Sequence, residues 1–506
     1  MLFIAAAFAQ DTPPAEEAPP AEETPPAEET PPAEETPEVT DARVELEMKD
    51  YTFEHHGELR FVGSSYPDFA VDSDGTMVDQ GPALDSRLRM GGVMTMGGST
   101  LDVELDLFDA QIAGDVWALS EDDERRRADK GVMNGGAYTL RKAKVSGLVG
   151  PAMLSAGFTT SHWGLGMLAN DGAHDPTFGR NDLGDRVFRV SAATRLPTTL
   201  APLSLVVAGD RVLADDVARF SEGQAAYQGI FAAVLGDREG SHFGLYTVYR
   251  SQRELDPRRR TRVGVLDVSA AHVVGAGPVD LHVAGEAAGV LGTTSRTLNY
   301  NYRDQLAVKS GGATALVAAE ADFFRLQLRG GWASGDGDSY DSTTSDFSFD
   351  RNFDVGMVMF DEFQGGLENG AYLQLTDPHN TGKPPDGIDG LLTEGAFRRA
   401  TFIQPAITVN PKPWGSIRLG VVSAWQTAPI AQGFESHRAG GVATNHLGQP
   451  TSDTWMGWEL DWAVILSGER DGKVPQFLLQ GGHYFASEDL GSGRHDLVTG
   501  TARIRW

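Results

Sequence analysis

The chain has 506 residues, of which 60 are glycine and none is cysteine, and its 71 acidic and 42 basic side chains give a net charge of −29 at pH 7. Without cysteine there is no disulfide framework and no thiolate metal site, and so acidic a chain is unsuited to nucleic acid, whose phosphates need basic partners. No stretch approaches the ~18 consecutive apolar residues of a transmembrane helix. A soluble all-β protein or a membrane β-barrel remains.

The N-terminal segment predicts an exported chain with a spacer. Residues 1–9 hold an apolar run that ends in Ala-Phe-Ala, as a signal-peptide core with its cleavage site does, although the usual basic start is missing. Residues 10–42 repeat Pro-Pro-Ala-Glu-Glu every six residues, with eleven acidic side chains and no basic ones. Such a segment has nothing to bury, so we expect a disordered, extended linker. Docking to a periplasmic or cell-wall partner is the alternative to a passive role.

From residue 43 to residue 506 the dominant pattern has a period of two, which is that of a pleated strand. Between Leu101 and Leu107 the odd positions are apolar and the even positions acidic. Between Met456 and Leu466 the even positions are apolar, with Glu459 and Asp461 on the other face. A soluble β-sandwich also alternates, so this pattern alone does not separate the two classes.

Three further features favour the membrane barrel. Some alternating runs reach ten to twelve residues, long enough for a tilted strand to cross a bilayer. The apolar faces carry aromatic residues where interfacial girdles are expected. The last nine residues alternate and end on an aromatic residue, which resembles the C-terminal signature that the barrel-assembly machinery of bacterial outer membranes reads. The predicted interfacial aromatics are Trp332, Trp425, Trp458, Trp462 and Trp506.

The connections predict the size of the barrel. Gly150-Pro151 and Gly275–Pro278 have the composition of tight turns, whereas residues 120–136, 251–260, 334–350, 375–394 and 433–453 are long and polar. Short turns at one end and long loops at the other are typical of outer-membrane barrels. With about 25–28 residues for each strand and its share of the turns, we expect an all-β, antiparallel transmembrane barrel of 16 to 18 strands.

Charged residues opposite the apolar faces are predicted to line the lumen, because water reaches them only there. Charges on opposite walls would create a transverse field, whereas charges that pair would partly close the lumen. The predicted lumen residues are Arg87, Arg89, Asp102, Glu104, Asp106, Arg325, Arg329, Glu459, Asp461, Arg503 and Arg505.

Signals for catalysis or cofactors are weak. The sequence has no phosphate-binding loop, no nucleophile elbow and no zinc-protease motif, so we expect neither an enzyme nor a cofactor. A Ser–His or Asp–His pair brought together by the fold would escape such a search. Asp336, Asp338 and Asp341 are spaced faintly like a calcium loop, but the glutamate of an EF-hand is replaced by Phe347. A turn-prone extracellular loop is the preferred interpretation.

As a whole the sequence resembles the porin-like outer-membrane barrels and, within them, the alginate-export-like group. The resemblance lies in Ser161–Gly172, Trp332–Asp341, Phe347–Phe360 and the terminal Trp506. It implies a multi-pass barrel in the outer membrane of a Gram-negative cell, in contact with lipid, that passes polar or charged solutes or exports an anionic polysaccharide. The group is known for basic lumens, and the mixed charges of this chain depart from that pattern and leave the substrate open. A plugged structural or adhesive barrel is the alternative.

Overall fold

The computed structural model describes residues 51–79, 81–114, 118–119, 138–180, 184–237, 240–254, 259–296, 305–338, 341–381, 395–468 and 473–506. The predicted signal segment 1–9, the linker 10–42 and the loop 120–136 lie outside these ranges. Among the described residues, none of the helices is long and apolar enough to cross a membrane.

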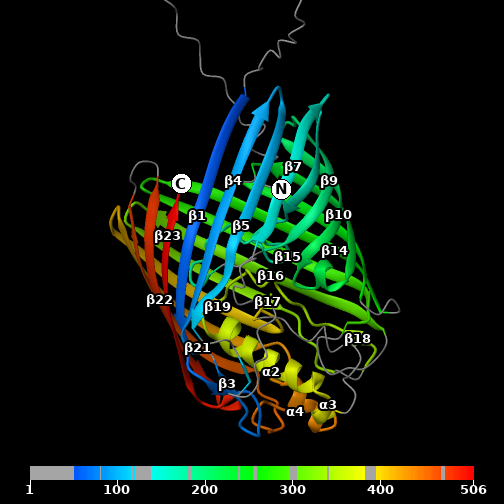
Figure 1. The fold of residues 1–506 in the computed structure, drawn as a ribbon, viewed down its shortest axis with the longest axis vertical. Coiled ribbons are helices and arrows are strands. Elements are labelled where there is room, and N and C mark those ends of the chain that lie inside the picture. Colours follow the sequence, from blue (N-terminus) through cyan, green and yellow to red (C-terminus); the bar gives the residue numbers. More distant parts are fainter. Residues whose placement is uncertain are drawn as a thin grey trace, which may run out of the picture.

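The main sheet closes on itself as an antiparallel barrel (Figure 1). It contains 20 strands, and two of these, the two-residue β11 and β18, are short additions from loops, which leaves 18 in the wall. Each wall strand pairs with its neighbour along the chain, and β1 closes the ring against β23. The prediction of a transmembrane-type barrel is confirmed, at the upper end of the expected strand number. The wall strands are β1 (Tyr51–Ser65), β4 (Ala83–Met96), β5 (Ser99–Gly114), β7 (Tyr138–Val149), β8 (Ala152–Thr160), β9 (Arg186–Leu196), β10 (Leu203–Asp215), β12 (Ala225–Gly236), β13 (His242–Arg253), β14 (Arg260–Ala276), β15 (Val279–Thr294), β16 (Leu306–Ala321), β17 (Phe324–Ala333), β19 (Ala400–Lys412), β20 (Gly415–Gln426), β21 (Trp455–Ser467), β22 (Val474–Ala486) and β23 (Arg494–Arg505).

Short and long connections segregate to opposite ends of the barrel. Gly150-Pro151 joins β7 to β8 and Gly277-Pro278 joins β14 to β15, as predicted. The expected loop 251–260 is shorter than predicted, because β13 continues to Arg253 and β14 begins at Arg260. The small elements lie in the long connections, and Figure 1 shows the helices at one end of the barrel. They are β2 (Phe69–Ala70), β3 (Met77–Asp79), β6 (Ala118–Leu119), β11 (Ala218–Arg219), η1 (Phe220–Glu222), β18 (Thr343–Thr344), η2 (Met359–Gln364), α2 (Gly365–Thr376), α3 (Pro378–Thr381), α4 (Gly433–Arg438) and η4 (Glu488–Leu490).

The outer face of the wall is apolar and the inner face polar. On β5, Leu101 is exposed, whereas Asp102, Glu104 and Asp106 are buried inside. A bilayer is the solvent that such an outer surface requires, because an exposed apolar belt of this size is unfavourable in water. The period-two pattern therefore predicted correctly which face of the wall is apolar and exposed.

One deviation from that pattern occurs in β21. The register shifts where Trp455 pairs with Trp425, and Gly457 has a positive φ of 120°. A side chain at Gly457 would overlap the backbone carbonyl of Phe485, so the bulge requires glycine. The bulge turns Met456 inward, where it is buried, and the prediction that Met456 shares the outer face with Trp458 is wrong.

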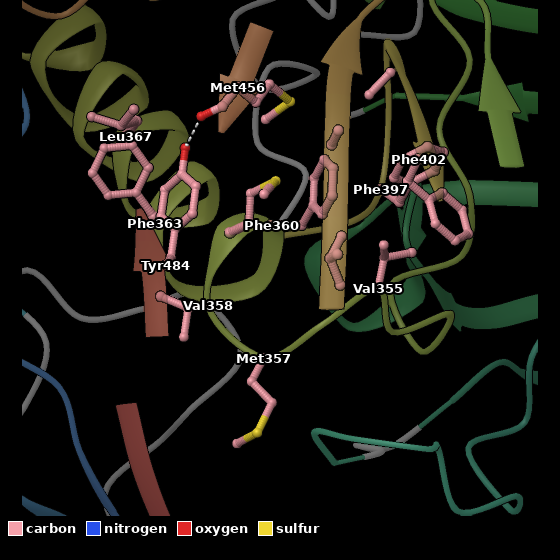
Figure 2. Packing of buried hydrophobic residues seen from close by; sticks show 14 of the residues in the cluster. Val355, Met357, Val358, Phe360, Phe363, Leu367, Phe397, Phe402, Met456 and Tyr484 are labelled. Carbon is pink, nitrogen blue, oxygen red and sulfur yellow. Dashed lines mark hydrogen bonds between the residues drawn. The ribbon is translucent and has the colours of Figure 1, made fainter. Parts of the chain in front are cut away.

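The hydrophobic core lies inside the barrel, between the wall and the connection from β17 to β19 (Figure 2). That connection carries η2 and α2 inward, and Phe360 and Phe363 pack against aromatic rings of the chain, among them Phe397 and Tyr484. The hydroxyl of Tyr484 donates a 2.6 Å hydrogen bond to the carbonyl of Met456. The described residues of the predicted loops 334–350 and 375–394 are thus parts of one folded insertion; residues 339–340 and 382–394 lie outside the described ranges.

Candidate functional site: a crossed and constricted lumen

The connection from β8 to β9 enters the barrel, and we call its described part, residues 161–180, the lumen loop. Trp163 at its start stacks on Tyr246 of β13, with ring centroids 4.9 Å apart, and donates a 3.0 Å hydrogen bond to Asp267 of β14. The Leu165 N–H donates to Glu286 of β15. The first turn of the loop is therefore anchored to the wall by buried carboxylates.

The far part of the lumen loop reaches the opposite wall. The carbonyl of Thr177 accepts a 2.9 Å hydrogen bond from Arg418 of β20, and Phe178 packs over Gly420 of the same strand, where a side chain would overlap its ring. The carbonyl of Gly179 accepts a hydrogen bond from Gln480 of β22. Around the ring of 18, β20 is ten strands from β8 in one direction and eight in the other, so the loop crosses the lumen.

A carboxylate of the lumen loop binds the last strand. Asp175 accepts hydrogen bonds of 2.8 and 2.5 Å from Arg503 and one of 3.1 Å from Arg505. Burial alone would raise the pKa of Asp175, but the hydrogen bond and the charge of Arg503 outweigh it and hold that pKa well below its usual range. Arg505 also donates to Glu58 of β1 at 2.8 Å, so this cluster spans the seam of the barrel.

Most of the other predicted lumen charges are paired with neighbours on the same wall. Arg87 donates to Glu58 at 2.7 Å, and Arg89 donates to both oxygens of Asp106 at 2.7 and 2.8 Å. Glu104 accepts from Arg141 of β7 at 2.8 Å. Asp102 is buried on the same inner face of β5. Oppositely charged residues thus lie side by side on one wall. This is the paired arrangement expected to close the lumen in part, and not the arrangement with the two signs on opposite walls.

The two predicted arginines of β17 have different surroundings. Arg325 binds Glu320 of the adjacent β16 at 2.7 Å near the short-turn end. Arg329 donates to Gln404 at 2.9 Å and to the carbonyl of Asp354, and its guanidinium lies over the ring of Phe353 at 5.0 Å. Arg329 therefore fastens the inserted connection to the wall.

Glu459 of β21 also holds that inserted connection. It accepts backbone hydrogen bonds from Met357 at 2.5 Å, Val358 at 2.8 Å and Met359 at 2.7 Å. Three consecutive N–H groups directed at one carboxylate form an anion-binding nest at the start of η2. Asp461 lies fully buried two residues along the same strand. Both acids face inward as predicted, but the backbone that binds Glu459 was not predictable from local spacing.

A cavity of about 290 Å³ lies between the wall and the inserted connection. Valines of the wall and the acids Asp185, Asp216 and Asp350 line it. Burial, together with the charges of the neighbouring acids, raises the pKa of Asp185 and of Asp350 well above the usual range. This chamber therefore combines an apolar wall with carboxyl groups whose charged form is disfavoured by burial.

The predicted interfacial aromatics lie on the outer face. Trp332, Trp425 and Trp458 are exposed, and Trp458 stacks on Phe485 of β22 with centroids 4.2 Å apart. Trp462 covers Gly481, and Trp506 covers Gly57, so that a side chain at either glycine would overlap an indole ring. Trp506 also exchanges two backbone hydrogen bonds with Gly57, of 2.9 and 3.1 Å, across the seam.

The weak calcium candidate is not assembled. The carboxylate of Asp336 accepts the Asp338 N–H at 3.0 Å, and that of Asp341 accepts the Thr343 N–H at 2.7 Å. These bonds are those of turns, and within the described ranges the three carboxylates do not converge as a group of ligands.

No family model matches the sequence, and no curated protein matches it. Solved structures do resemble the fold. The crystal structure of OccK8 (OprE) from Pseudomonas aeruginosa superposes with a TM-score of 0.52 at 10% identity, over 90% of this chain and 98% of that one. OccK9 (OpdG) of the same organism gives 0.51 at 12% identity, with the same coverage.

The chain has the fold of an outer-membrane porin barrel. Closed antiparallel topology, an apolar belt and 18 strands agree with a multi-pass barrel of the outer membrane. The similar structures are Occ proteins and give no support to the alginate-export-like group. At such low identity they establish the fold, and the function must be argued from the lumen.

Proposed function

We propose that the protein is a porin-like channel for the passive passage of small polar or charged solutes across the outer membrane. The observation that carries this proposal is the water accessibility of charged groups inside the barrel. Asp175 keeps 47% of its side chain accessible and Arg505 44%, although both belong to the cluster between the lumen loop and the wall. A constriction built from hydrated ions is passable to polar solutes, whereas a sealing plug would be packed with apolar side chains.

Small solutes fit this lumen better than a polysaccharide. The lumen loop crosses the lumen, and the arginines on β4 and β23 are paired with Glu58, Asp106 and Asp175. A polyanion would have to displace these carboxylates along its whole length. A small solute needs to exchange hydrogen bonds with only a few of them at a time, so we do not retain export of an anionic polysaccharide.

A plugged structural barrel is the second candidate, and one observation favours it. The apolar cluster around η2 lies inside the barrel and joins the inserted connection to the wall through residues such as Phe402 and Tyr484. If this packing seals every route, the long loops would be the functional surface. Catalysis is not part of either proposal.

The C-terminal strand supports a proposal about assembly. Because Trp506 completes the seam with β1, we propose that the strand ending in Trp506 is the part presented to the barrel-assembly machinery before closure. Exchange of that strand for a scrambled sequence with the same composition is expected to stop membrane insertion in cells.

Liposome swelling tests the channel proposal. Proteoliposomes with the folded barrel are expected to swell in isotonic monosaccharide or amino-acid solutions and to remain unchanged in an oligoalginate solution. Equal resistance to every solute, with a folded barrel verified by heat-modifiable gel mobility, would favour the plugged barrel. Passage of the oligoalginate would contradict the restriction to small solutes.

A further inference from the structure

Two histidines and one aspartate meet at the base of the lumen loop. The Nδ1 atoms of His162 and His174 lie 3.7 and 3.9 Å from Oδ1 of Asp171, and the two imidazole rings have centroids 4.7 Å apart. Each residue offers a ligand atom within 4.8 Å of the other two. Within the described ranges, this is the one group of three or more such side chains with that geometry.

The carboxylate of this group is held in place by the surrounding chain. Asp171 Oδ1 accepts the Ala173 N–H at 3.1 Å, and the backbone carbonyl of Asp171 accepts from Arg141 at 2.9 Å. Two backbone hydrogen bonds join the two ends of the connection. The Ser161 N–H donates to the backbone carbonyl of Asp185 at 3.2 Å, and the Asp185 N–H donates to the backbone carbonyl of Asn170 at 2.9 Å. The three side chains therefore belong to a part of the loop whose backbone is fixed by hydrogen bonds, and not to an unsupported loop tip.

Two imidazoles and one carboxylate form a donor set typical of divalent transition metals, whereas calcium and magnesium prefer oxygen alone. In a tetrahedral zinc site, ligand atoms about 2.0–2.2 Å from the metal lie about 3.3 Å apart. The two histidine nitrogens lie 3.7 and 3.9 Å from the Asp171 oxygen, and all three ligand atoms lie within 4.8 Å of one another, so these separations have to shorten by about 0.5–1.5 Å. Such a shift is within the reach of rotation about the side-chain bonds.

We propose that His162, Asp171 and His174 bind one divalent transition-metal ion of the Zn²⁺ type, with water in the remaining coordination positions. The side chains of His162 and Asp171 are 11% and 10% exposed, whereas that of His174 is 57% exposed. The site is thus walled on one side and open to water on the other, so that an ion can enter from the aqueous space.

The position of the site connects it to the constriction. His174 precedes Asp175, which binds Arg503, so an ion held by His174 and Asp171 fixes the backbone next to the anchor of the lumen loop. Bound metal is therefore expected to steady the loop in its crossing position. Metal binding itself does not depend on the proposed channel function. Only the effect of the metal on the constriction rests on that function.

Isothermal titration of Zn²⁺ into the detergent-folded barrel, purified without a histidine tag, tests the site. The wild-type protein is expected to bind one ion, and His174→Ala, which alters the most exposed ligand, is expected to weaken binding at least tenfold. His379→Ala is the matched control, because His379 also lies beside a carboxylate, with Nδ1 3.0 Å from Asp377 Oδ1, but outside any group of three ligands within the described ranges. Its affinity for Zn²⁺ is expected to equal that of the wild type.

Co²⁺ in place of Zn²⁺ gives a second readout, since imidazole and carboxylate ligation in a four-coordinate site produces visible absorption that is far more intense than the weak bands of hexaaquo Co²⁺. Loss of this absorption in His162→Ala and His174→Ala, but not in His379→Ala, is the expected result. Absence of saturable binding to the wild type, or equal affinity in wild type and His174→Ala, would overturn the proposal. Neither readout uses ion current, so a plugged barrel would leave the metal result interpretable.

Discussion

Asp175 and Arg503 are joined by two hydrogen bonds of 2.8 and 2.5 Å, although 328 residues separate them in the chain. One belongs to the lumen loop and the other to the last strand of the wall. A bidentate arginine–carboxylate pair fixes distance and orientation together. This pair is therefore one of the anchors that hold the lumen loop in its crossing position.

Asp175→Asn is expected to loosen the lumen loop without unfolding the wall. The neutral amide keeps the shape of the side chain but loses charge-assisted bonds to two arginines. Hydrogen exchange measured by mass spectrometry should accelerate in peptides covering residues 161–180 and remain unchanged in β20. Equal acceleration throughout the barrel would mean that Asp175 supports the wall and not the loop.

The same anchor predicts a dependence on pH. The pKa of Asp175 is lower in the folded protein than the ~3.9 of a free aspartate, so its stabilising contribution is complete above about pH 4 and is lost as the pH falls further. The hydrogen-exchange rates of the amides in residues 161–180, corrected for the intrinsic effect of pH, should be constant between about pH 8 and 5. They should rise only below about pH 4. The Asp175→Asn variant should lack this rise.

Adjacent positions on β17 should differ in their access to water. Arg325 faces inward with a side chain 35% exposed, whereas the apolar Leu326 is exposed on the outer face. Because the chain has no cysteine, Arg325→Cys and Leu326→Cys each introduce a unique thiol. In proteoliposomes a membrane-impermeant methanethiosulfonate should label the first and spare the second. Equal labelling would contradict the assignment of the two faces.

The seam predicts a difference between two glycines of β1. A side chain at Gly57 would overlap the indole of Trp506, whereas one at Gly63 would have 4.0 Å to the nearest atom. Gly57→Val is therefore expected to destabilise the barrel by about 1–3 kcal/mol, as overpacking does. Cold gel electrophoresis after graded heating should show a lower transition temperature for Gly57→Val than for Gly63→Val. Equal transition temperatures for the two variants would show that the Trp506 indole moves aside without a loss of stability.

The buried imidazole of His446 predicts that the connection between β20 and β21, at the long-loop end, loosens in acid. Burial lowers the pKa of His446 to about 4, whereas an exposed imidazole has about 6.5. Between these values an opened loop binds a proton that the folded one excludes, so folded stability is complete above about pH 6.5 and falls as the pH decreases toward about 4. Limited proteolysis between residues 427 and 454 should increase from about pH 7 to about pH 5, and His446→Gln should remove most of that change.

The wall was predictable and the obstruction inside it was not. Alternation along β5 and β23 is a local pattern, so the sequence was enough to predict inward charges such as Asp106 and Arg503 and an outward Trp506. The path of the segment that begins at Trp163, by contrast, could not be predicted. Its partners lie on β13, β14 and β20, and no spacing within the segment encodes them.

Two signals in the sequence could have indicated that obstruction. Trp163 and Phe178 are large apolar residues in a polar, glycine-rich connection, and an exposed loop has no reason to carry them. Likewise, Phe347–Phe360 is too apolar for a solvated loop, and the structure buries much of it beneath η2. The partners of Glu459 remain unpredictable, because backbone N–H groups carry no residue signature.

Single-channel conductance of the intact barrel in a planar bilayer tests the central claim, that the lumen is a water-filled path narrowed by the lumen loop. The comparison is between the wild type and a variant in which residues 173–178 are replaced by two glycines. The account predicts stepwise current in the wild type and steps at least twofold larger in the variant. A variant that folds but conducts like the wild type, or the absence of steps in both, would contradict it.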